Sequence, residues 1–158
     1  MLGDLSGKSI LDLACGEGYY TRKLKQREAT RVLGVDISEK MIELARQDET
    51  KEPLGIEYII RDARELGEIG KFDMVVAAYL LNYAQTKEQL LEMCQSIYTN
   101  LKPGGRFVTL NNNPEQSLSS YSKTEKYGLI KKVSKPLHVR YTDRNDAHNR
   151  SRKKSSQC

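Results

Sequence analysis

Short apolar segments alternate with helix-like segments through the first two thirds of the chain. Each apolar segment is bounded by polar or turn residues, which is typical of a buried strand. The expected strands span residues 9–13, 31–36, 55–60, 72–79 and 106–110. Strands that alternate with helices predict an α/β protein with a parallel sheet and right-handed crossovers.

The helices between these strands have recognisable boundaries. The first two are expected at residues 19–28 and 39–48, with Ser38 as a good N-cap of the second. Residues 86–89 fit the capping-box pattern at the start of a third helix, and the Pro and Gly residues within 102–105 are expected to end it. From helical spacing, the residues expected to face the sheet are Tyr20, Leu24, Met41, Ile42, Leu44, Ala45, Leu90, Cys94, Ile97 and Leu101.

The turn after the first strand carries the strongest functional signal. In a sheet of this kind ligands bind at the carboxyl ends of the strands, near the point where the strand order reverses. Gly16 and Gly18 in this turn let the backbone approach a ligand closely. Asp36 lies 20 positions after Gly16, at the end of the second strand, where a carboxylate can accept hydrogen bonds from both hydroxyls of a ribose. Asp62 closes the third strand and could meet the edge of an adenine.

Two ligands that contain adenosine are consistent with this pattern, a nicotinamide dinucleotide and S-adenosyl-L-methionine. The dinucleotide fingerprint has a third small residue where this chain has Thr21. Asp12 and Glu17 would also repel the pyrophosphate of a dinucleotide. S-adenosylmethionine carries a sulfonium and an amino group, both positive, so the acidic turn favours S-adenosylmethionine.

Five segments resemble, in order and spacing, the successive motifs of class I S-adenosylmethionine-dependent methyltransferases. They are DLACGEG, VLGVDIS, RDA, FDMVVAAYLLNYA and LKPGGRF. The resemblance covers roughly residues 7–113 and is closest to the small-molecule-type methyltransferase domain. It implies a Rossmann-like, doubly wound, mostly parallel sheet in a single domain. It also implies S-adenosyl-L-methionine as cofactor and methyl transfer to a small-molecule substrate.

The resemblance also implies which residues contact the methionine part of the cofactor. The backbone around Ala14, Cys15 and Gly16 would contact it, in the turn that Gly18 completes. Asp12 would bind the amino group, through water. Taken alone, Asp12 could instead be a solubilising residue at a strand end, and Cys15 could be present only for its small size.

The nucleoside half of the cofactor is implied to lie against the next two strands. Asp36 would bind the ribose and Ile37 would pack on the adenine, while Asp62 and Ala63 would meet the adenine edge. Asp36 could instead be an acidic residue favoured by the dipole at a helix start, and Asp62 could be a helix cap. The sequence predicts that Asp36→Ala weakens cofactor binding and barely alters folding stability.

Residues after the fourth strand lie where a substrate should approach. The resemblance implies that Ala78 and Tyr79 face the methionine end and the incoming substrate. Asn82 and Tyr83 are nearby and are as well explained as packing residues. Methyl transfer from a sulfonium needs mainly in-line positioning and desolvation, so no catalytic residue is assigned.

The ends of the chain depart from the pattern of a full class I methyltransferase. Residues 1–113 are expected to form the cofactor-binding core, and residues 114–142 an incomplete C-terminal part with irregular or missing strands. Residues 143–158 read as a basic, disordered tail. The chain is therefore expected to be a fragment, a truncated gene model or a degenerate copy.

Charge and composition limit the kinds of partner that the chain is expected to bind. Residues 1–122 hold 15 Lys/Arg against 18 Asp/Glu, whereas residues 123–158 hold 11 against 3, so the basic charge belongs to the tail. Few aromatic residues interleave with that charge, which makes nucleic acid an unlikely partner. Neither a membrane span nor a signal peptide is visible, and the three cysteines lack metal-ligand spacing. These features predict a cytoplasmic protein with free thiols and no metal, and they leave the oligomeric state open.

Three functions follow from the sequence. The leading one is S-adenosylmethionine-dependent methyl transfer to a small molecule. The second is a cofactor-binding remnant or regulatory pseudoenzyme without turnover. The third, and least favoured, is a nucleic-acid-directed methyltransferase that uses the basic tail.

Overall fold

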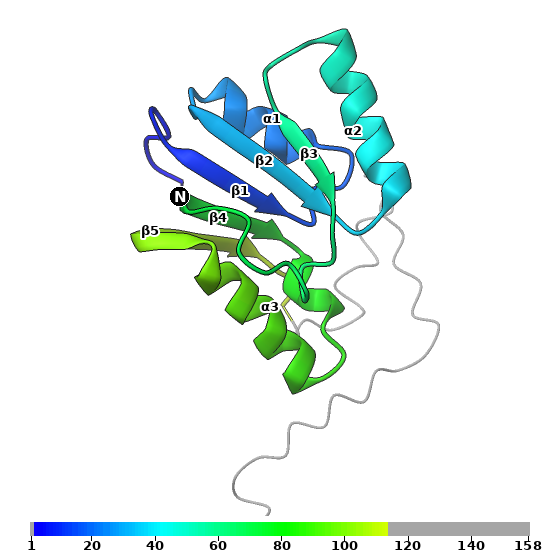
Figure 1. Ribbon diagram of the computed structural model, residues 1–158, viewed down its shortest axis with the longest axis vertical. Coiled ribbons are helices and arrows are strands. Elements are labelled where there is room, and N and C mark those ends of the chain that lie inside the picture. The colour runs from blue at the N-terminus through cyan, green and yellow to red at the C-terminus, as the bar shows by residue number, and fades with distance from the viewer. Residues whose placement is uncertain (1, 114–158) are drawn as a thin grey trace, which may run out of the picture. The chain divides into compact units, whose positions relative to one another are not determined.

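The computed structural model describes residues 2–113, which contain a five-stranded sheet with helices on both of its faces (Figure 1). The strands are β1 (Ser9–Leu13), β2 (Arg31–Asp36), β3 (Glu57–Ile60), β4 (Phe72–Ala78) and β5 (Leu101–Leu110). Their order in the sheet is β3-β2-β1-β4-β5, and all four pairings are parallel. The chain therefore proceeds outward from β1 to β3 and then crosses to the other side of β1. The order reverses between β1 and β4, and this confirms the predicted Rossmann-like, doubly wound fold.

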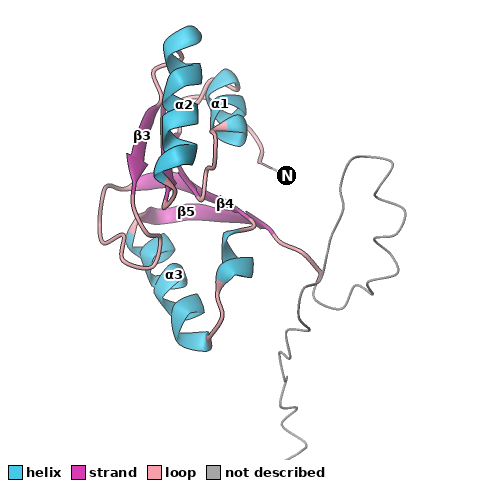
Figure 2. Cartoon of the chain, turned by 90° about the vertical axis from the view of Figure 1, so that its right-hand side faces the viewer, coloured by secondary structure: helices cyan, strands magenta, loops and turns pink. Residues whose placement is uncertain are grey.

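Three α-helices and one short 3-10 helix connect the strands. They are α1 (Tyr19–Gln26), α2 (Glu39–Lys51), the 3-10 helix η1 (Leu80–Tyr83) and α3 (Lys87–Thr99). Helices α1 and α2 cover one face of the sheet and α3 covers the other (Figure 2). The segments expected to form the incomplete C-terminal part (114–142) and the basic tail (143–158) lie outside the described residues.

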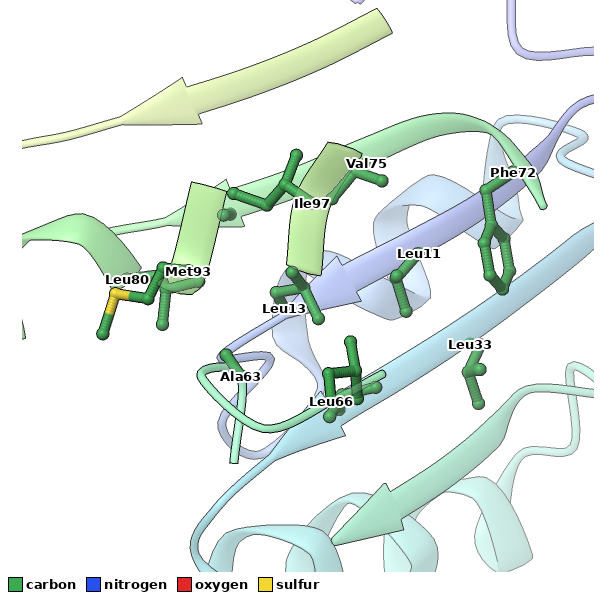
Figure 3. Packing of buried hydrophobic residues seen from close by; sticks show 12 residues of the cluster. Leu11, Leu13, Leu33, Ala63, Leu66, Phe72, Val75, Leu80, Met93 and Ile97 are labelled. Atoms are coloured by element: carbon green, nitrogen blue, oxygen red, sulfur yellow. The ribbon is translucent and has the colours of Figure 1, made fainter. Parts of the chain in front are cut away.

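The alternation of side chains along each strand divides the core between the two faces. Leu11 and Leu13 pack on the α3 face with Met93 and Ile97, as Figure 3 shows. Ile10, the residue before Leu11, packs on the other face with residues of α1 and β2. Both faces of the central strands are buried, which is why these segments read as continuous apolar runs.

The inner faces of the helices differ in part from the prediction. Leu24, Ile42, Ala45 and Ile97 are buried as expected. Tyr20, Met41, Leu90 and Cys94 are exposed instead, while Thr21 and Met93 are buried. In α3 the apolar residues form a stripe too broad to define one face. The face with both Met93 and Ile97, one helical turn apart, is the face that contacts the sheet.

The connection from α3 to β5 also differs from the prediction. Strand β5 begins at Leu101, which pairs with Phe72, and the pairing then resumes at Arg106. The four residues between these two positions have no partner in the pairing, so the expected turn interrupts the pairing within β5 and does not precede the strand.

The side chain of Asn100 fixes this connection in place, although nothing in the sequence predicted this role. The residue is fully buried. Its side-chain Nδ2 donates to the carbonyls of Gly67 and Ser96, both at 2.8 Å, and its Oδ1 accepts from the backbone N–H of Ile69 at 2.9 Å. Its own carbonyl accepts from the N–H of Phe72 at 2.8 Å. One side chain therefore joins the end of α3 to the loop that leads into β4.

Candidate functional site

The turn between β1 and α1 has an alternating left-handed backbone. Ala14, Gly16 and Gly18 have φ angles of 59°, 57° and 85°. Between them, Cys15 donates its N–H to the carbonyl of Val35 on β2 at 3.0 Å. A left-handed conformation at a non-glycine residue costs roughly 1–2 kcal/mol, so Ala14 stores strain at the end of the central strand.

Asp36 connects this turn to the end of β2. Its Oδ2 accepts from the backbone N–H of Gly16 at 2.9 Å, and its Oδ1 accepts from the N–H of Ser38 at 2.8 Å. An ionised carboxylate offers about four acceptor positions, so each oxygen keeps one for a ligand hydroxyl. Ser38 accepts in turn from the N–H of Met41 and caps α2, as predicted.

The two glycines of the turn have different surroundings. A β-carbon placed at Gly16 would have no heavy atom within 4 Å, so the backbone there borders open space. A β-carbon placed at Gly18 would lie 2.5 Å from the hydroxyl oxygen of Tyr58. Gly16 therefore fits the predicted close approach to a ligand, whereas Gly18 is required by packing against Tyr58.

Asp12 is buried beneath the turn, with 2% of its surface exposed. Its Oδ2 accepts a hydrogen bond of 2.7 Å from the hydroxyl of Thr21 on α1. Burial raises the pKa of Asp12 to about 7; the Thr21 hydrogen bond opposes this rise and the negative charge of Asp36 adds to it. Asp12 can therefore change its charge near neutral pH, and its side chain points to α1.

Cys15 is a packing residue by its surroundings. Its thiol is buried and belongs to an apolar cluster with residues of α2 and β3. Burial raises the pKa of this thiol far above its ordinary value, so it stays protonated at neutral pH. A protonated, buried thiol is a poor nucleophile, which agrees with the prediction that Cys15 is present for its size.

Asp62 follows β3 and is paired with Arg64. Asp62 accepts from the backbone N–H of Arg64 at 2.8 Å, and the guanidinium Nε donates to its two oxygens at 3.1 and 3.0 Å. The Arg64 side chain lowers the pKa of Asp62 below its ordinary value. Ala63 is buried in the apolar cluster on the α3 face, so only its backbone is left for a ligand.

The end of β4 contains a second strained residue. Tyr79, directly after Ala78, has a φ of 64°, which is rare for a bulky side chain. Its N–H donates to the carbonyl of Leu110 at the end of β5, at 2.6 Å. Its side chain is exposed, and that of Tyr83, one helical turn later, is 73% exposed. Tyr79 and Ala14 therefore mark, with unusual backbone, the ends of the two strands between which the order reverses.

All the predicted site residues lie at or shortly after the carboxyl ends of four neighbouring strands, β1 to β4. Asp12 is in β1 and pairs with Gly34 of β2, and Gly34 in turn pairs with Tyr58 of β3. Asp12 also pairs with Val76 of β4, two residues before the end of that strand. Ile37, the residue after β2, is 64% exposed. The structure thus brings the predicted residues to one edge of the sheet, where Asp36 accepts from the N–H of Gly16 and the carbonyl of Cys15 accepts from the N–H of Gly18 at 3.0 Å.

Three residues near the site were not predicted as members of it. Thr21 was considered only as a mismatch to the dinucleotide fingerprint, and its hydroxyl on an inward helix position was the available signal. Tyr58 gave no signal, because a ring contact with residues on other strands has no fixed spacing in a sequence. Arg64 lies only two residues after Asp62, and this short spacing was a local signal that sequence reasoning missed.

Within residues 2–113, no three His, Cys, Asp or Glu side chains are grouped so that they could bind a metal ion. None of the helices in the same range is both long enough and apolar enough to cross a membrane. The cytoplasmic location stays a prediction.

The model of a family described as a methyltransferase domain matches residues 10–105 of the chain. A demethylmenaquinone methyltransferase of Lactococcus lactis is 38% identical over 115 residues, which are 69% of this chain and 44% of that relative. A ubiquinone biosynthesis O-methyltransferase of Acinetobacter baylyi is 32% identical over 121 residues, covering 73% of this chain and 49% of that relative. The chain thus spans less than half the length of either relative.

Solved structures show the same fold. An S-adenosylmethionine-dependent methyltransferase from Mesorhizobium loti superposes with a TM-score of 0.63 at 32% identity, over 72% of this chain and 50% of the other. A second S-adenosylmethionine-dependent methyltransferase, from Clostridium acetobutylicum, gives a TM-score of 0.62 at 27% identity, over 66% and 43% of the two chains.

Proposed function

The chain belongs to the methyltransferase domain family, and we propose that it binds S-adenosyl-L-methionine at the carboxyl ends of β1 to β4 and transfers the methyl group to a small molecule. One observation carries the proposal: the Asp36 carboxylate accepts from the N–H groups of Gly16 and Ser38. These two bonds fix both oxygens of Asp36 beside the turn after β1, and each oxygen keeps an acceptor position for a ribose hydroxyl.

The charge of the turn supports this cofactor over a dinucleotide. Asp12, Glu17 and Asp36 all lie within or beside the segment that would contact the ligand. Three carboxyl groups favour a sulfonium and an ammonium and disfavour a pyrophosphate. Thr21 is buried against Asp12, so the position of the third small residue of a dinucleotide fingerprint is used for a hydrogen bond within the protein.

The described residues fit the methionine end of the cofactor. The open space beside Gly16 leaves room for a ligand against the backbone of Ala14 and Cys15. Asp12, beneath this backbone, would favour the cationic groups of the ligand when its carboxyl is ionised. When bound, S-adenosylmethionine supplies a methyl group made electrophilic by the sulfonium.

The nucleoside end would lie along β2 and β3. Asp36 would orient the ribose, and the exposed side chain of Ile37 would cover one face of the adenine. Asp62 would accept from the adenine edge next to the backbone of Ala63. Because Asp62 already binds Arg64, its carboxylate is fixed in position before a ligand arrives.

A small, ring-bearing methyl acceptor is the first class to test. Tyr79 and Tyr83 are exposed after β4, and Ala78 ends that strand beside β1, so these residues would face the acceptor. Aromatic side chains favour contact with the face of another ring. Two relatives are named as a demethylmenaquinone methyltransferase and a ubiquinone biosynthesis O-methyltransferase, so ring compounds related to menaquinone and ubiquinone form the starting library of acceptors.

Titration calorimetry tests the cofactor part of the proposal. S-adenosylmethionine and its demethylated product are expected to bind, and a nicotinamide dinucleotide is expected not to bind. Tighter binding of the dinucleotide would overturn the assignment.

A screen with methyl-labelled S-adenosylmethionine against the acceptor library tests turnover. Transfer of label to a small molecule supports an enzyme. Cofactor binding without transfer to any acceptor supports the alternative of a binding protein without turnover.

A further inference from the structure

We propose that Tyr58 is a positioning residue for the cofactor turn: its ring fills the space of two absent side chains, at Gly18 and Gly34, and sets the position of residues 14–18. The inference rests on the proposed function, because the turn is the segment that would contact S-adenosylmethionine. It adds a residue that touches neither the proposed ligand nor the acceptor.

Tyr58 lies in one row with two residues of the neighbouring strands. Gly34 of β2 pairs with Tyr58 of β3 on one side and with Asp12 of β1 on the other. Residues paired in this way project from the same face of a sheet. Because Gly34 has no side chain, the Tyr58 ring can lie over β2 and extend toward the turn after β1.

The distances show how closely the ring fills this space. A β-carbon at Gly34 would lie 2.6 Å from Cδ1 of Tyr58, and a β-carbon at Gly18 would lie 2.5 Å from its Oη. Both values are below any normal contact, so neither position accepts a side chain while the ring is present. Gly34 lacks the positive φ that often explains a glycine, so a glycine is needed there chiefly because of the Tyr58 ring, with Sγ of Cys15 also 3.0 Å from such a β-carbon.

The ring and Asp36 support the turn from two sides. Asp36 binds the N–H of Gly16, whereas Tyr58 contacts Gly18, the N-cap residue directly before α1. Cys15, between these two contacts, packs in the same apolar cluster as Tyr58. Apart from the hydrogen bonds between backbone groups, the turn is therefore fixed by the Asp36 carboxylate and by one packed ring.

The hydroxyl of Tyr58 is not what supports the turn. The side chain is 5% exposed, and its buried oxygen has no hydrogen-bond partner within the described part of the chain. Burial also raises the pKa of the phenol, so the hydroxyl stays neutral. Shape, and not a hydrogen bond, is what the turn requires from this residue.

The test compares Tyr58→Phe, Tyr58→Leu and the control Ile56→Ala. Ile56 is a buried member of the same cluster, two residues earlier on the chain and toward the opposite end of the strands.

Affinity for S-adenosylmethionine is measured by calorimetry, and stability by urea unfolding. Tyr58→Phe is expected to bind within about twofold of the parent. Tyr58→Leu is expected to bind about ten- to a hundredfold more weakly, since a misplaced contact costs this much. Ile56→Ala is expected to lose stability and keep its affinity.

Two outcomes of this comparison contradict the inference. Parent-like affinity in Tyr58→Leu shows that the turn does not depend on the ring. Equal losses of affinity in Tyr58→Leu and Ile56→Ala show that any loss of packing has the same effect.

If Tyr58→Leu does not fold, Gly34→Ala and the double variant Gly34→Ala/Tyr58→Leu replace it. The smaller side chain is then expected to restore affinity to Gly34→Ala, and a double variant no better than Gly34→Ala contradicts the inference.

A measurement made without cofactor distinguishes a failure of this inference from a failure of the proposed function. Alkylation of Cys15, measured peptide by peptide, reports whether the turn has moved from its buried position. Tyr58→Leu is expected to increase the rate at Cys15 relative to the parent, and Tyr58→Phe is not. A parent protein that fails to bind S-adenosylmethionine refutes the proposed function, while an unchanged Cys15 rate in Tyr58→Leu refutes the role of Tyr58.

Discussion

The backbone N–H of Gly16 donates to Oδ2 of Asp36 over 2.9 Å, which joins the turn after β1 to the end of β2. The other oxygen of Asp36 accepts from Ser38, at the start of α2. The carboxylate that we propose to bind a ribose thus also fixes the two backbone segments on either side of it. The sequence suggested only the first of these roles.

Asp36→Ala is therefore expected to affect both binding and stability. Loss of one or two hydrogen bonds to a charged group, about 1.5–3 kcal/mol each, should weaken S-adenosylmethionine binding by roughly tenfold to a few hundredfold. Loss of the bonds to Gly16 and Ser38 should also lower the free energy of unfolding by on the order of 1 kcal/mol. This prediction differs from the expectation drawn from the sequence, which was that stability would barely change. Calorimetry and urea unfolding measure the two effects.

The matched control for Asp36→Ala is Glu39→Ala. Glu39 lies in the first turn of α2 and shares any favourable effect of the helix dipole, but no bond joins it to the turn after β1 in the described structure. The Glu39→Ala variant should bind the cofactor with the affinity of the parent. Equal, parent-like affinity in both variants would mean that Asp36 is only a charge at a helix start.

The two glycines of the turn should respond differently to alanine. Gly16→Ala adds a methyl group on an open side of the backbone, so the protein should fold with a loss of about 1–2 kcal/mol from the left-handed conformation. Its affinity for S-adenosylmethionine should fall, because the methyl group occupies the space proposed for the ligand. Gly18→Ala has a similar backbone cost and also forces the Tyr58 ring to move, so it should be the less stable variant. Thermal unfolding ranks the two, and the opposite ranking would contradict the different surroundings described for Gly16 and Gly18.

Asn100→Ala should be among the most destabilising single changes near the α3 face. It removes the acceptor for the N–H of Ile69 and the donor to the carbonyls of Gly67 and Ser96. Unpaired buried groups cost about 1–3 kcal/mol each, so the unfolding free energy should fall by about 2–4 kcal/mol. Urea unfolding measures the loss.

Ser96→Ala provides the comparison, since Ser96 is also buried and its hydroxyl makes only one long hydrogen bond of 3.5 Å, to the carbonyl of Arg64. The unfolding free energy of Ser96→Ala should fall by less than about 1 kcal/mol. If both variants lose the same stability, the Asn100 side chain does not close the connection between α3 and β5.

The structural features that sequence reasoning predicted are those with a local signal. The β1 segment is apolar on both faces, and the 20-residue interval from Gly16 to Asp36 belongs to a single β-α-β unit. Such features depend on residues close together in the chain. The alternation of strands and helices predicts a parallel sheet, while the doubly wound order came from the resemblance to a known family.

The contacts that sequence reasoning missed join segments without a fixed spacing. Thr21 binds Asp12 only because α1 packs on β1, and the Tyr58 ring crosses β2 only because position 34 is a glycine. The face of α3 was assigned wrongly at Leu90 and Cys94, since tertiary packing and not the apolar pattern selects the inner stripe. Those interactions become visible only when the sheet is assembled.

The Asp12–Thr21 pair predicts how stability depends on pH. Burial raises the pKa of Asp12 from 3.8 to about 7, so between these values the folded protein binds more protons than the unfolded chain. The contribution of Asp12 to stability is then fully present below about pH 3.8 and is lost as pH rises to about 7. Asp12→Asn lacks this titration and its side-chain oxygen can still accept from Thr21. Its stability relative to the parent should rise across this interval by about 1.4 kcal/mol per pH unit and level off above it.

Ligand binding should depend on the same carboxyl in the opposite direction. A cationic ligand favours the ionised form of Asp12, so parent affinity for S-adenosylmethionine should increase as pH rises from 6 to 8, in a range set by the pKa of about 7. Asp12→Asn should show no such increase. Thr21→Val serves as the second comparison, because it removes the hydrogen bond that opposes the raised pKa and should shift the rise in affinity to higher pH. Calorimetry at several pH values measures all three proteins. Identical pH profiles in the parent and Asp12→Asn would show that Asp12 keeps one charge state across this range, and that its burial beneath the turn serves packing alone.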